Sequence, residues 1–172
     1  MTIAWAITGC GHYLTQVMAI LAELPGADVF LSRAAEEVLT IYNHDIDTLV
    51  RSGKKVYRER AYSSPMVGRL YHQQYRLLVI APATSNSVAK FVLGISDSLV
   101  ANLFAQAGKC RVPIVVLPSD TDEAVTSPGP RGPVQVFPRP IDLANTDQLV
   151  DFPGVTVVKE IKELEQCLRA YL

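Results

Sequence analysis

Cysteine is scarce in this sequence, and Cys10, Cys110 and Cys167 stand far apart along the chain. Their odd number and wide spacing exclude a disulfide framework, a CxxC redox pair and an all-cysteine metal cluster. No apolar run approaches the roughly 18 residues that a membrane helix needs. The opening MTIAWAITGCGHYL also lacks the basic residues with which a signal peptide begins. We therefore expect a soluble, cytoplasmic protein.

An excess of basic charge is missing as well. The 172 residues include 16 Lys and Arg against 17 Asp and Glu, which gives a net charge of −1. Nucleic-acid-binding domains usually present a basic face, so we expect neither nucleic acid nor a membrane as a partner. One local basic cluster is more typical of a solvated helix end or loop; it consists of Arg51, Lys54, Lys55, Arg58 and Arg60.

Apolar residues, in contrast, are plentiful at 49% of the chain, while charged residues make up 19%. This composition supports a sizeable core in a chain of single-domain length. Neither an internal repeat nor a linker interrupts the sequence. Residues 1–172 are therefore expected to form a single domain.

Short apolar runs alternate with amphipathic stretches along the chain. The predicted strands are 3–7, 27–31, 77–81, 112–117 and 155–158, and the predicted helices are 12–24, 33–42, 85–92, 96–108 and 160–172. Ser96 is the expected N-cap of the helix that begins there. The polar residues 43–60 are expected to add a short helix and a short strand. This order predicts an α/β fold with a doubly wound parallel sheet, a Rossmann or flavodoxin-like structure of three layers.

A long proline-rich segment stands apart from this alternation. Residues 118–140 contain six of the eleven prolines and are predicted to form an extended loop. A loop of that length inside a compact domain is usually functional or an oligomer contact.

Ligands of a doubly wound sheet bind outside the carboxyl ends of its strands, which makes the strand exits informative. The first exit reads Thr8-Gly9-Cys10-Gly11-His12. Its glycines let backbone N–H groups approach a phosphate at a helix N-terminus. The dinucleotide pattern GxGxxG is incomplete, because Leu14 stands at the third glycine position. A tight strand-to-helix turn without a ligand is an equally good interpretation of this exit.

The second exit, Ser32-Arg33, indicates whether the predicted site binds a dinucleotide or a mononucleotide. A dinucleotide site needs Asp or Glu here to bind the ribose, whereas this sequence has a hydroxyl and a guanidinium. Both groups suit a phosphate. The exit therefore disfavours NAD and favours a mononucleotide such as FMN.

The third exit is the most informative, because four consecutive side chains that can hydrogen-bond follow a buried strand and a proline. They are Thr84, Ser85, Asn86 and Ser87. Such groups can bind a phosphate or the polar edge of a flavin ring without adding charge. A helix N-cap would explain one of the four, so we interpret the segment as a binding site.

At this point the sequence resembles a known family. The segment APATSNSVAKFVLGISDSLVANLF is similar to the PASANT region and GIxDxL continuation of the homo-oligomeric flavin-containing cysteine decarboxylases and their flavoprotein relatives. The opening AITGCGHYL resembles the first phosphate loop of that superfamily. Together with Ser32 and the segment PRPIDLANTDQLVDFPGV, these motifs resemble the archaeoflavoprotein and dihydromethanopterin reductase branch.

The resemblance implies FMN as cofactor, with its phosphate bound by Gly9, Cys10, Gly11 and Ser32. It implies that Thr84, Ser85, Asn86 and Ser87 contact the phosphate, the ribityl chain or the ring. It also implies a homotrimer or a larger homo-oligomer, with FMN between subunits. Four apolar residues are candidates for that subunit contact, with ordinary core packing as the alternative: Phe91, Leu99, Leu103 and Phe104.

Two decarboxylase signatures are missing. The family histidine thirteen residues before Ala81 is replaced by Gly68, and the nearest histidine is His72. Where the decarboxylases have PxMNxxMW, residues 117–122 read LPSDTD. Oxidative decarboxylation is therefore disfavoured. The ferredoxin-like cysteine runs of some relatives are also missing, so electrons are expected from an external donor: NAD(P)H, a flavodoxin or a ferredoxin.

Two residues of the first exit are candidates for chemistry. His12 is a weak catalytic candidate, as a proton donor or a phosphate contact; an exposed polar residue is the alternative. Cys10 is a candidate reactive thiol, because a helix N-terminus lowers a thiol pKa; a small residue that fits the turn is the alternative. Whether His12, His72 or Cys10 takes part in chemistry stays open.

Four charged residues have two possible roles. Lys90 and Asp97 are either charges on a helix surface or partners at the cofactor site. Arg139 and Asp142 follow the proline-rich segment, where they are candidates for contact with a substrate headgroup or a neighbouring subunit.

Together, these observations predict an FMN-dependent reductase, in which reduced flavin delivers a hydride to a C=N bond of a dihydropterin of the dihydromethanopterin type. Three alternatives stay open: an FMN electron-transfer flavoprotein without a small-molecule substrate, a flavin-dependent decarboxylase or prenyltransferase, and a nucleotide-binding domain without flavin.

Overall fold

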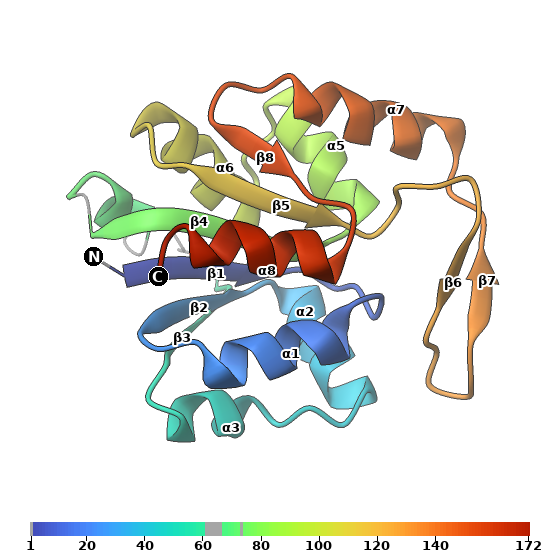
Figure 1. The fold of residues 1–172 in the computed structure, drawn as a ribbon, viewed down its shortest axis with the longest axis horizontal. Helices are drawn as coiled ribbons and strands as arrows, with labels where there is room; N and C mark the ends of the chain where they lie inside the picture. The colour runs from blue at the N-terminus through green and yellow to red at the C-terminus, as the bar shows by residue number, and fades with distance from the viewer. Residues whose placement is uncertain (1, 61–66, 73) are drawn as a thin grey trace.

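A six-stranded parallel sheet organises the computed structural model, which describes residues 2–60, 67–72 and 74–172 (Figure 1). The strand order is β3-β2-β1-β4-β5-β8. The strands are β1 (Thr2–Ile7), β2 (Ala27–Leu31), β3 (Lys55–Arg58), β4 (Tyr75–Ala83), β5 (Ile114–Pro118) and β8 (Val155–Val157). The order reverses between β1 and β4, the point at which such sheets bind ligands. The predicted doubly wound α/β fold is confirmed.

Helices cover both faces of the sheet. They are α1 (Leu14–Glu23), α2 (Arg33–Ile41), α3 (Ile46–Arg51), α5 (Ser85–Leu93), α6 (Leu99–Lys109), α7 (Pro140–Val150) and α8 (Ile161–Arg169), with a 3-10 turn η1 (Gly68–Leu70). Alternate residues of β1 face the two layers. Trp5 packs in the core beneath α1, α2 and α8, whereas Ala4 and Ala6 face the core beneath α5 and α6.

Burial explains why the central strands read as continuous apolar runs. Every residue of β2 and β5 is buried, as parallel strands covered on both faces require. The Trp5 indole N–H donates to the Ala81 carbonyl at 2.9 Å, so the one polar atom of this core side chain is satisfied. This contact ties β1 to β4 one residue before Pro82.

Helix α6 begins later than the sequence suggested, and Ser98 rather than Ser96 is its N-cap. Gly94 ends α5 in the left-handed conformation, with φ 71°. The chain then needs residues 95–97 to turn before the next helix. The Ser98 hydroxyl accepts a hydrogen bond from the Ala101 N–H at 3.2 Å, which fixes the start of α6.

Helix α7 is not revealed by apolar periodicity, because its buried face is largely polar. The buried residues are Asp142, Asn145, Thr146 and Leu149, so an apolar stripe is absent. The Thr146 hydroxyl donates to the Asp120 carbonyl at 3.2 Å. The last helix, predicted over residues 160–172, ends at Arg169, and Leu172 beyond it is 63% exposed.

The proline-rich segment is not a plain loop but contains an antiparallel hairpin, β6 (Val125–Ser127) and β7 (Val134–Val136). The hairpin stands away from the body beside the carboxyl ends of the strands (Figure 1). A hydrogen bond links the hairpin to the body, since the Tyr42 hydroxyl donates to the Pro128 carbonyl at 2.6 Å. Its apolar side chains are open to solvent, with Phe137 69% exposed.

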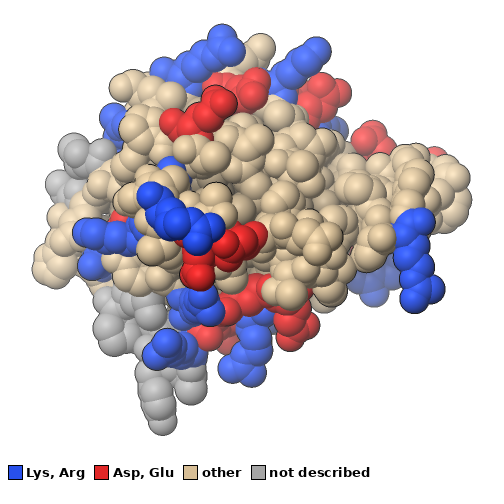
Figure 2. Space-filling view, turned by 90° about the horizontal axis from the view of Figure 1, so that it is seen from below, with Lys and Arg blue, Asp and Glu red and all other residues tan. Residues whose placement is uncertain are grey.

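Charges of both signs are interspersed over the face drawn in Figure 2. Within the predicted basic cluster, the exposed Arg51 pairs with Asp45 at 2.7 Å and the exposed Arg58 with Glu36 at 3.3 Å, whereas Lys54, expected to be solvated, is only 5% exposed. Among the described residues, no helix has the length and apolar character to cross a bilayer. Nor does the described part of the chain bring three His, Cys, Asp or Glu side chains together for a metal ion.

Candidate functional site

Thr8 joins the exits of the two central strands. Its hydroxyl donates to the Pro82 carbonyl at 2.9 Å and accepts from the Thr84 N–H at 2.8 Å. The Thr8 N–H also donates to the Pro82 carbonyl, at 3.2 Å. Because Thr8 is 2% exposed, its hydroxyl is shielded from water, and these bonds hold the β1 and β4 exits together. The predicted site residues did not include Thr8, although a hydroxyl directly after a buried strand is a usable signal.

A cavity of about 410 Å³ opens at these exits. It brings together five of the eight predicted cofactor residues: Gly9, Ser32, Thr84, Asn86 and Ser87. They come from three strand exits that are distant in sequence, as the doubly wound fold requires. Cys10, Gly11 and Ser85 are not part of its lining. The assignment of all eight residues to FMN stays a prediction.

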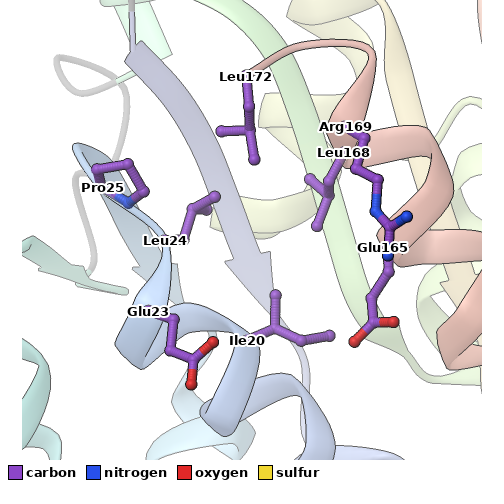
Figure 3. Close-up of a pocket in the computed structure, with 8 residues that line it drawn as sticks. All are labelled: Ile20, Glu23, Leu24, Pro25, Glu165, Leu168, Arg169 and Leu172. Atoms are coloured by element: carbon purple, nitrogen blue, oxygen red, sulfur yellow. The ribbon is translucent and has the colours of Figure 1, made fainter.

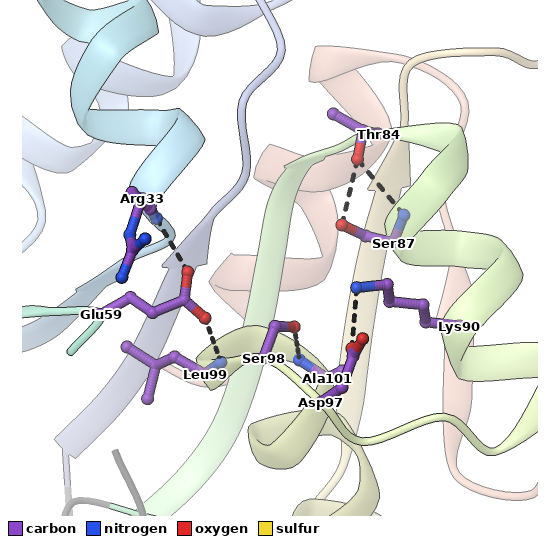
Figure 4. A network of polar contacts seen from close by, with 9 residues as sticks. All are labelled: Arg33, Glu59, Thr84, Ser87, Lys90, Asp97, Ser98, Leu99 and Ala101. Carbon is purple, nitrogen blue, oxygen red and sulfur yellow. Dashed lines mark hydrogen bonds and ion pairs between the residues drawn. The ribbon is translucent and has the colours of Figure 1, made fainter. Parts of the chain in front are cut away.

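Three helix N-termini meet at this cavity. Ser32, Thr84 and Ser98 are the N-caps of α2, α5 and α6, and each side-chain oxygen accepts a first-turn N–H, at 3.0, 3.3 and 3.2 Å respectively. Figure 4 shows the Thr84 and Ser98 caps. Helix N-termini carry partial positive charge and N–H groups without intrahelical partners. Their convergence makes the cavity suited to an anion.

Glu59 spans two of these N-termini (Figure 4). One carboxylate oxygen accepts the Arg33 N–H at 2.9 Å, and the other accepts the Leu99 N–H at 2.6 Å. Arg33 and Leu99 are the first residues of α2 and α6, which pack on opposite faces of the sheet. Sequence reasoning missed Glu59, because it lies in a polar stretch and its partners are 26 and 40 residues away.

The charged side chains that line the cavity are balanced. Arg33 and Lys90 contribute positive charge, and Glu37 and Glu59 contribute negative charge. Lys90 also pairs with Asp97 at 2.7 Å, and this hydrogen bond lowers the pKa of the Asp97 carboxyl. Lys90 thus lines the cavity and also forms an ion pair, whereas Asp97 does not line the cavity and contacts it only through Lys90. The attraction for an anion comes mainly from the helix N-termini.

The glycines of the first exit are required by close packing. A Cβ at Gly9 would stand 2.5 Å from the Ala34 Cβ in the first turn of α2. A Cβ at Gly11 would overlap the Tyr42 hydroxyl, the group that anchors the hairpin. Glycine at both positions lets the loop after β1 lie directly against α2. The close approach brings the loop and the α2 N-terminus to one side of the cavity.

Cys10 is not the activated thiol that its place near a helix suggested. Burial raises its pKa to about 11, and the negative charge of Asp120 acts in the same direction. The hydrogen bonds with His12 and Ser119 lower the pKa by less. The thiol is therefore protonated near neutral pH and less nucleophilic than a thiolate. The alternative, a small residue that fits the turn, describes Cys10 better.

His12 lies just before α1, whose N-cap is Tyr13. Burial lowers its pKa, and Asp120 partly opposes that shift. Its Nδ1 is buried and has no hydrogen-bond partner among the described residues. Asp120 itself accepts a hydrogen bond from the Ser85 hydroxyl. His12 is thus a largely neutral imidazole near the strand exits with one nitrogen uncommitted, and it stays a candidate for proton transfer.

Other predicted candidates do not line the cavity. His72 lies just before β4, at the amino end of the sheet and away from the cavity. Arg139 and Asp142 bond to each other at 2.8 Å across the first turn of α7, and their contact with a substrate headgroup or a neighbouring subunit stays a prediction. The four candidate subunit contacts are all buried in one core, which supports the alternative: Phe91, Leu99, Leu103 and Phe104.

A second hollow of about 310 Å³ lies between the C-terminal ends of α1 and α8 (Figure 3). Its apolar lining includes Ile20, Leu24 and Leu168. Both helices run back from the carboxyl edge of the sheet, so this hollow is at the opposite edge. It brings none of the predicted cofactor residues together.

Two sequence relatives are named dihydromethanopterin reductase (acceptor). The Methanosarcina mazei protein is 41% identical over 140 residues, which cover 74% of this chain and 59% of the relative. The Methanocaldococcus jannaschii protein is 40% identical over 132 residues, which cover 70% of this chain and 54% of the relative. The chain thus spans little more than half the length of either reductase.

Among solved structures, Burkholderia xenovorans DmrB in complex with FMN, described as a cubic protein cage for redox transfer, is 42% identical. The match covers 99% of this chain and 94% of that one, with a TM-score of 0.89. The family model for flavoproteins matches residues 1–169. With a family match over nearly its whole length, the chain belongs to the flavoprotein family.

Proposed function

We propose that this chain is an FMN-dependent reductase, which reduces a dihydropterin of the dihydromethanopterin type to its tetrahydro form with electrons from an external donor. The observation that carries the proposal is the convergence of three helix N-termini on one cavity at the exits of β1, β2 and β4. This arrangement is suited to a phosphate-bearing ligand at the point where the strand order reverses.

The residues present fit the phosphate end of FMN. Ser32, Thr84 and Ser87 offer hydroxyl groups to one cavity, and Gly9 lets the backbone approach closely. These residues would bind the phosphate, with Cys10 and Gly11 continuing the same loop. Asn86 and Ser85 follow Thr84 and would lie toward the ribityl chain or the ring. When bound, FMN supplies the capacity to accept and donate a hydride.

The chain itself must orient the ligand and deliver a proton to the substrate nitrogen. Reduction of a C=N bond adds a hydride to carbon and a proton to nitrogen. His12 is the candidate for the proton, because its Nδ1 is buried without a partner among the described residues. Its lowered pKa keeps the ring largely neutral at pH 7, so it can pass a proton through its two nitrogens rather than hold a fixed charge.

The substrate, the donor and the assembly belong to the same proposal. The pterin follows from the activity for which the two reductases are named. We infer that the donor is NAD(P)H, a flavodoxin or a ferredoxin and that the reaction takes place in the cytoplasm. A trimer-based homo-oligomer is supported by the cage that DmrB forms and by the exposed apolar side chains of the hairpin, such as Val134 and Phe137.

The visible spectrum of the purified protein tests this function first. We expect flavin absorbance, or its appearance after incubation with FMN, and bleaching on anaerobic reduction. Addition of a dihydropterin should then restore the oxidised spectrum and yield the tetrahydro product. A protein that stays colourless with excess FMN would refute the proposal at the cofactor, and reduced flavin that no dihydropterin reoxidises would refute it at the substrate.

An electron-transfer flavoprotein is the second candidate. The observation that favours it is the description of DmrB as a cage for redox transfer, together with the length of the two reductases, which extend well beyond this chain. In that case the reduced flavin would be reoxidised by a redox protein and not by the dihydropterin.

A further inference from the structure

The carboxylate of Glu59 occupies a place where an anion would otherwise bind. Its two oxygens take the first N–H groups of α2 and α6, at 2.9 and 2.6 Å from Arg33 and Leu99. Phosphate oxygens bind helix N-termini through the same N–H groups. We propose that Glu59 restricts this cavity to ligands with a single phosphate group. The proposal rests on FMN as the proposed cofactor and assigns to Glu59 the selection of a mononucleotide over a dinucleotide.

Hydrogen-bond donors for one phosphate remain besides the two N–H groups that Glu59 binds. The hydroxyls of Ser32 and Ser87 line the cavity. So do Ala34 and Val100, the second residues of α2 and α6, whose N–H groups have no intrahelical partner. Ala34 and Val100 directly follow the two residues whose N–H groups Glu59 binds. The remaining hydroxyl and N–H groups therefore offer donors for one phosphate beside the carboxylate.

The charge balance opposes a second phosphate. Two cations and two carboxylates line the cavity, and Lys90 is already paired with Asp97 at 2.7 Å. A second phosphate would add negative charge close to Glu59, and the described residues provide no further lining cation to offset it. At about 6 Å and an effective dielectric constant of about 20, one such repulsion weakens binding by about a hundredfold before screening by salt reduces it. Glu59 is therefore a specificity residue as well as a link between two helices.

A purely structural role for Glu59 predicts a different result. If the carboxylate only holds α2 to α6, its loss would weaken every ligand of the cavity to a similar extent. If it limits the phosphate count, its loss would strengthen diphosphate binding selectively. The ratio of the affinities for one and two phosphates separates these two roles.

The test uses inorganic phosphate and pyrophosphate as competitors of FMN, followed by the recovery of FMN fluorescence. Glu59→Gln removes the charge and keeps one acceptor oxygen, and Glu59→Asp keeps the charge on a shorter side chain. Glu36→Gln is the matched control, because Glu36 lies in the first turn of α2 and pairs with Arg58. We expect Glu59→Gln to tighten the binding of both competitors, because each is repelled by the carboxylate, and to tighten that of pyrophosphate at least tenfold more than that of phosphate. Glu59→Asp and Glu36→Gln should keep the wild-type ratio.

Equal changes for both competitors in Glu59→Gln, or no change, would overturn the inference, and so would the same selective gain in Glu36→Gln. If Glu59→Gln does not fold, the wild-type protein decides: pyrophosphate should displace FMN less effectively than phosphate does, and more effective displacement would overturn the inference. A wild-type protein that binds no FMN would instead refute the proposed function, so the two failures are distinct.

Discussion

Thr8→Val is the substitution that most directly probes the link between the two central strand exits. Valine keeps the shape of threonine and removes the hydroxyl. The Pro82 carbonyl retains a partner, because the Thr8 N–H still donates to it at 3.2 Å. The Thr84 N–H, in contrast, loses the oxygen that it contacts at 2.8 Å, at a position where Thr8 is 2% exposed.

The expected loss of stability follows from that one unsatisfied group. A buried N–H without a partner costs about 1–3 kcal/mol, and we expect the free energy of unfolding to fall by about 2 kcal/mol. For a chain of this length, that corresponds to a lower melting temperature by about 4–8 °C. Because Thr84 caps α5 beside the cavity, the affinity for FMN should fall as well.

Urea denaturation of the FMN-free protein measures this effect without the stabilisation that a bound ligand adds. Thr8→Ser is the matched control, because it keeps the hydroxyl and loses only a methyl group, and it should retain FMN affinity. The reasoning would be refuted by a Thr8→Val protein as stable as wild type, or by one whose FMN affinity equals that of Thr8→Ser.

Three further predictions concern other parts of the site and fold. Gly9→Ala should destabilise the protein by about 1–3 kcal/mol through overpacking, since its Cβ would stand 2.5 Å from the Ala34 Cβ. The melting temperature should recover in the double variant Gly9→Ala/Ala34→Gly, and no recovery would contradict this packing argument. Cys10, with a pKa raised to about 11, should react slowly with iodoacetamide at pH 7 and faster as the pH rises toward 11, so rapid labelling at pH 7 would be inconsistent with its burial. The hydrogen bond with Arg139 lowers the pKa of Asp142, so the ionised Asp142 stabilises the folded protein. This stabilisation is complete above the ordinary carboxyl pKa of about 3.9 and is lost as the pH falls through the lower pKa of the folded state. Acid unfolding curves should show this loss in wild type and not in Asp142→Asn, and identical pH dependence of the two proteins would count against the pair.

The sequence was sufficient to predict the fold and most of the cavity because both depend on local patterns. Buried parallel strands read as apolar runs, and the residues that follow them meet at one edge of the sheet. Gly9, Ser32 and Thr84 could therefore be placed together from the amino-acid sequence alone. What the structure adds is the strand order, which shows that the exit of β1 lies between the exits of β2 and β4.

The parts that escaped prediction depend on contacts between distant residues or on buried polar faces. Glu59 finds its two partners 26 and 40 residues away, so nothing adjacent to it reveals its role. Helix α7 buries the polar residues Asp142 and Asn145, so its sequence lacks the apolar repeat by which a helix is predicted. For Cys10 the sequence leaves both a reactive thiol and a small residue that fits the turn open, and only the fold, which buries the thiol and raises its pKa, favours the second.

A crystal structure of the protein with FMN tests the central claim most directly. We predict that the phosphate lies in the cavity where α2, α5 and α6 begin, within hydrogen-bond distance of Ser32 or Ser87, with Glu59 still bound to the N-termini of α2 and α6. A flavin phosphate bound elsewhere, with solvent alone between these three helix ends, would contradict the account.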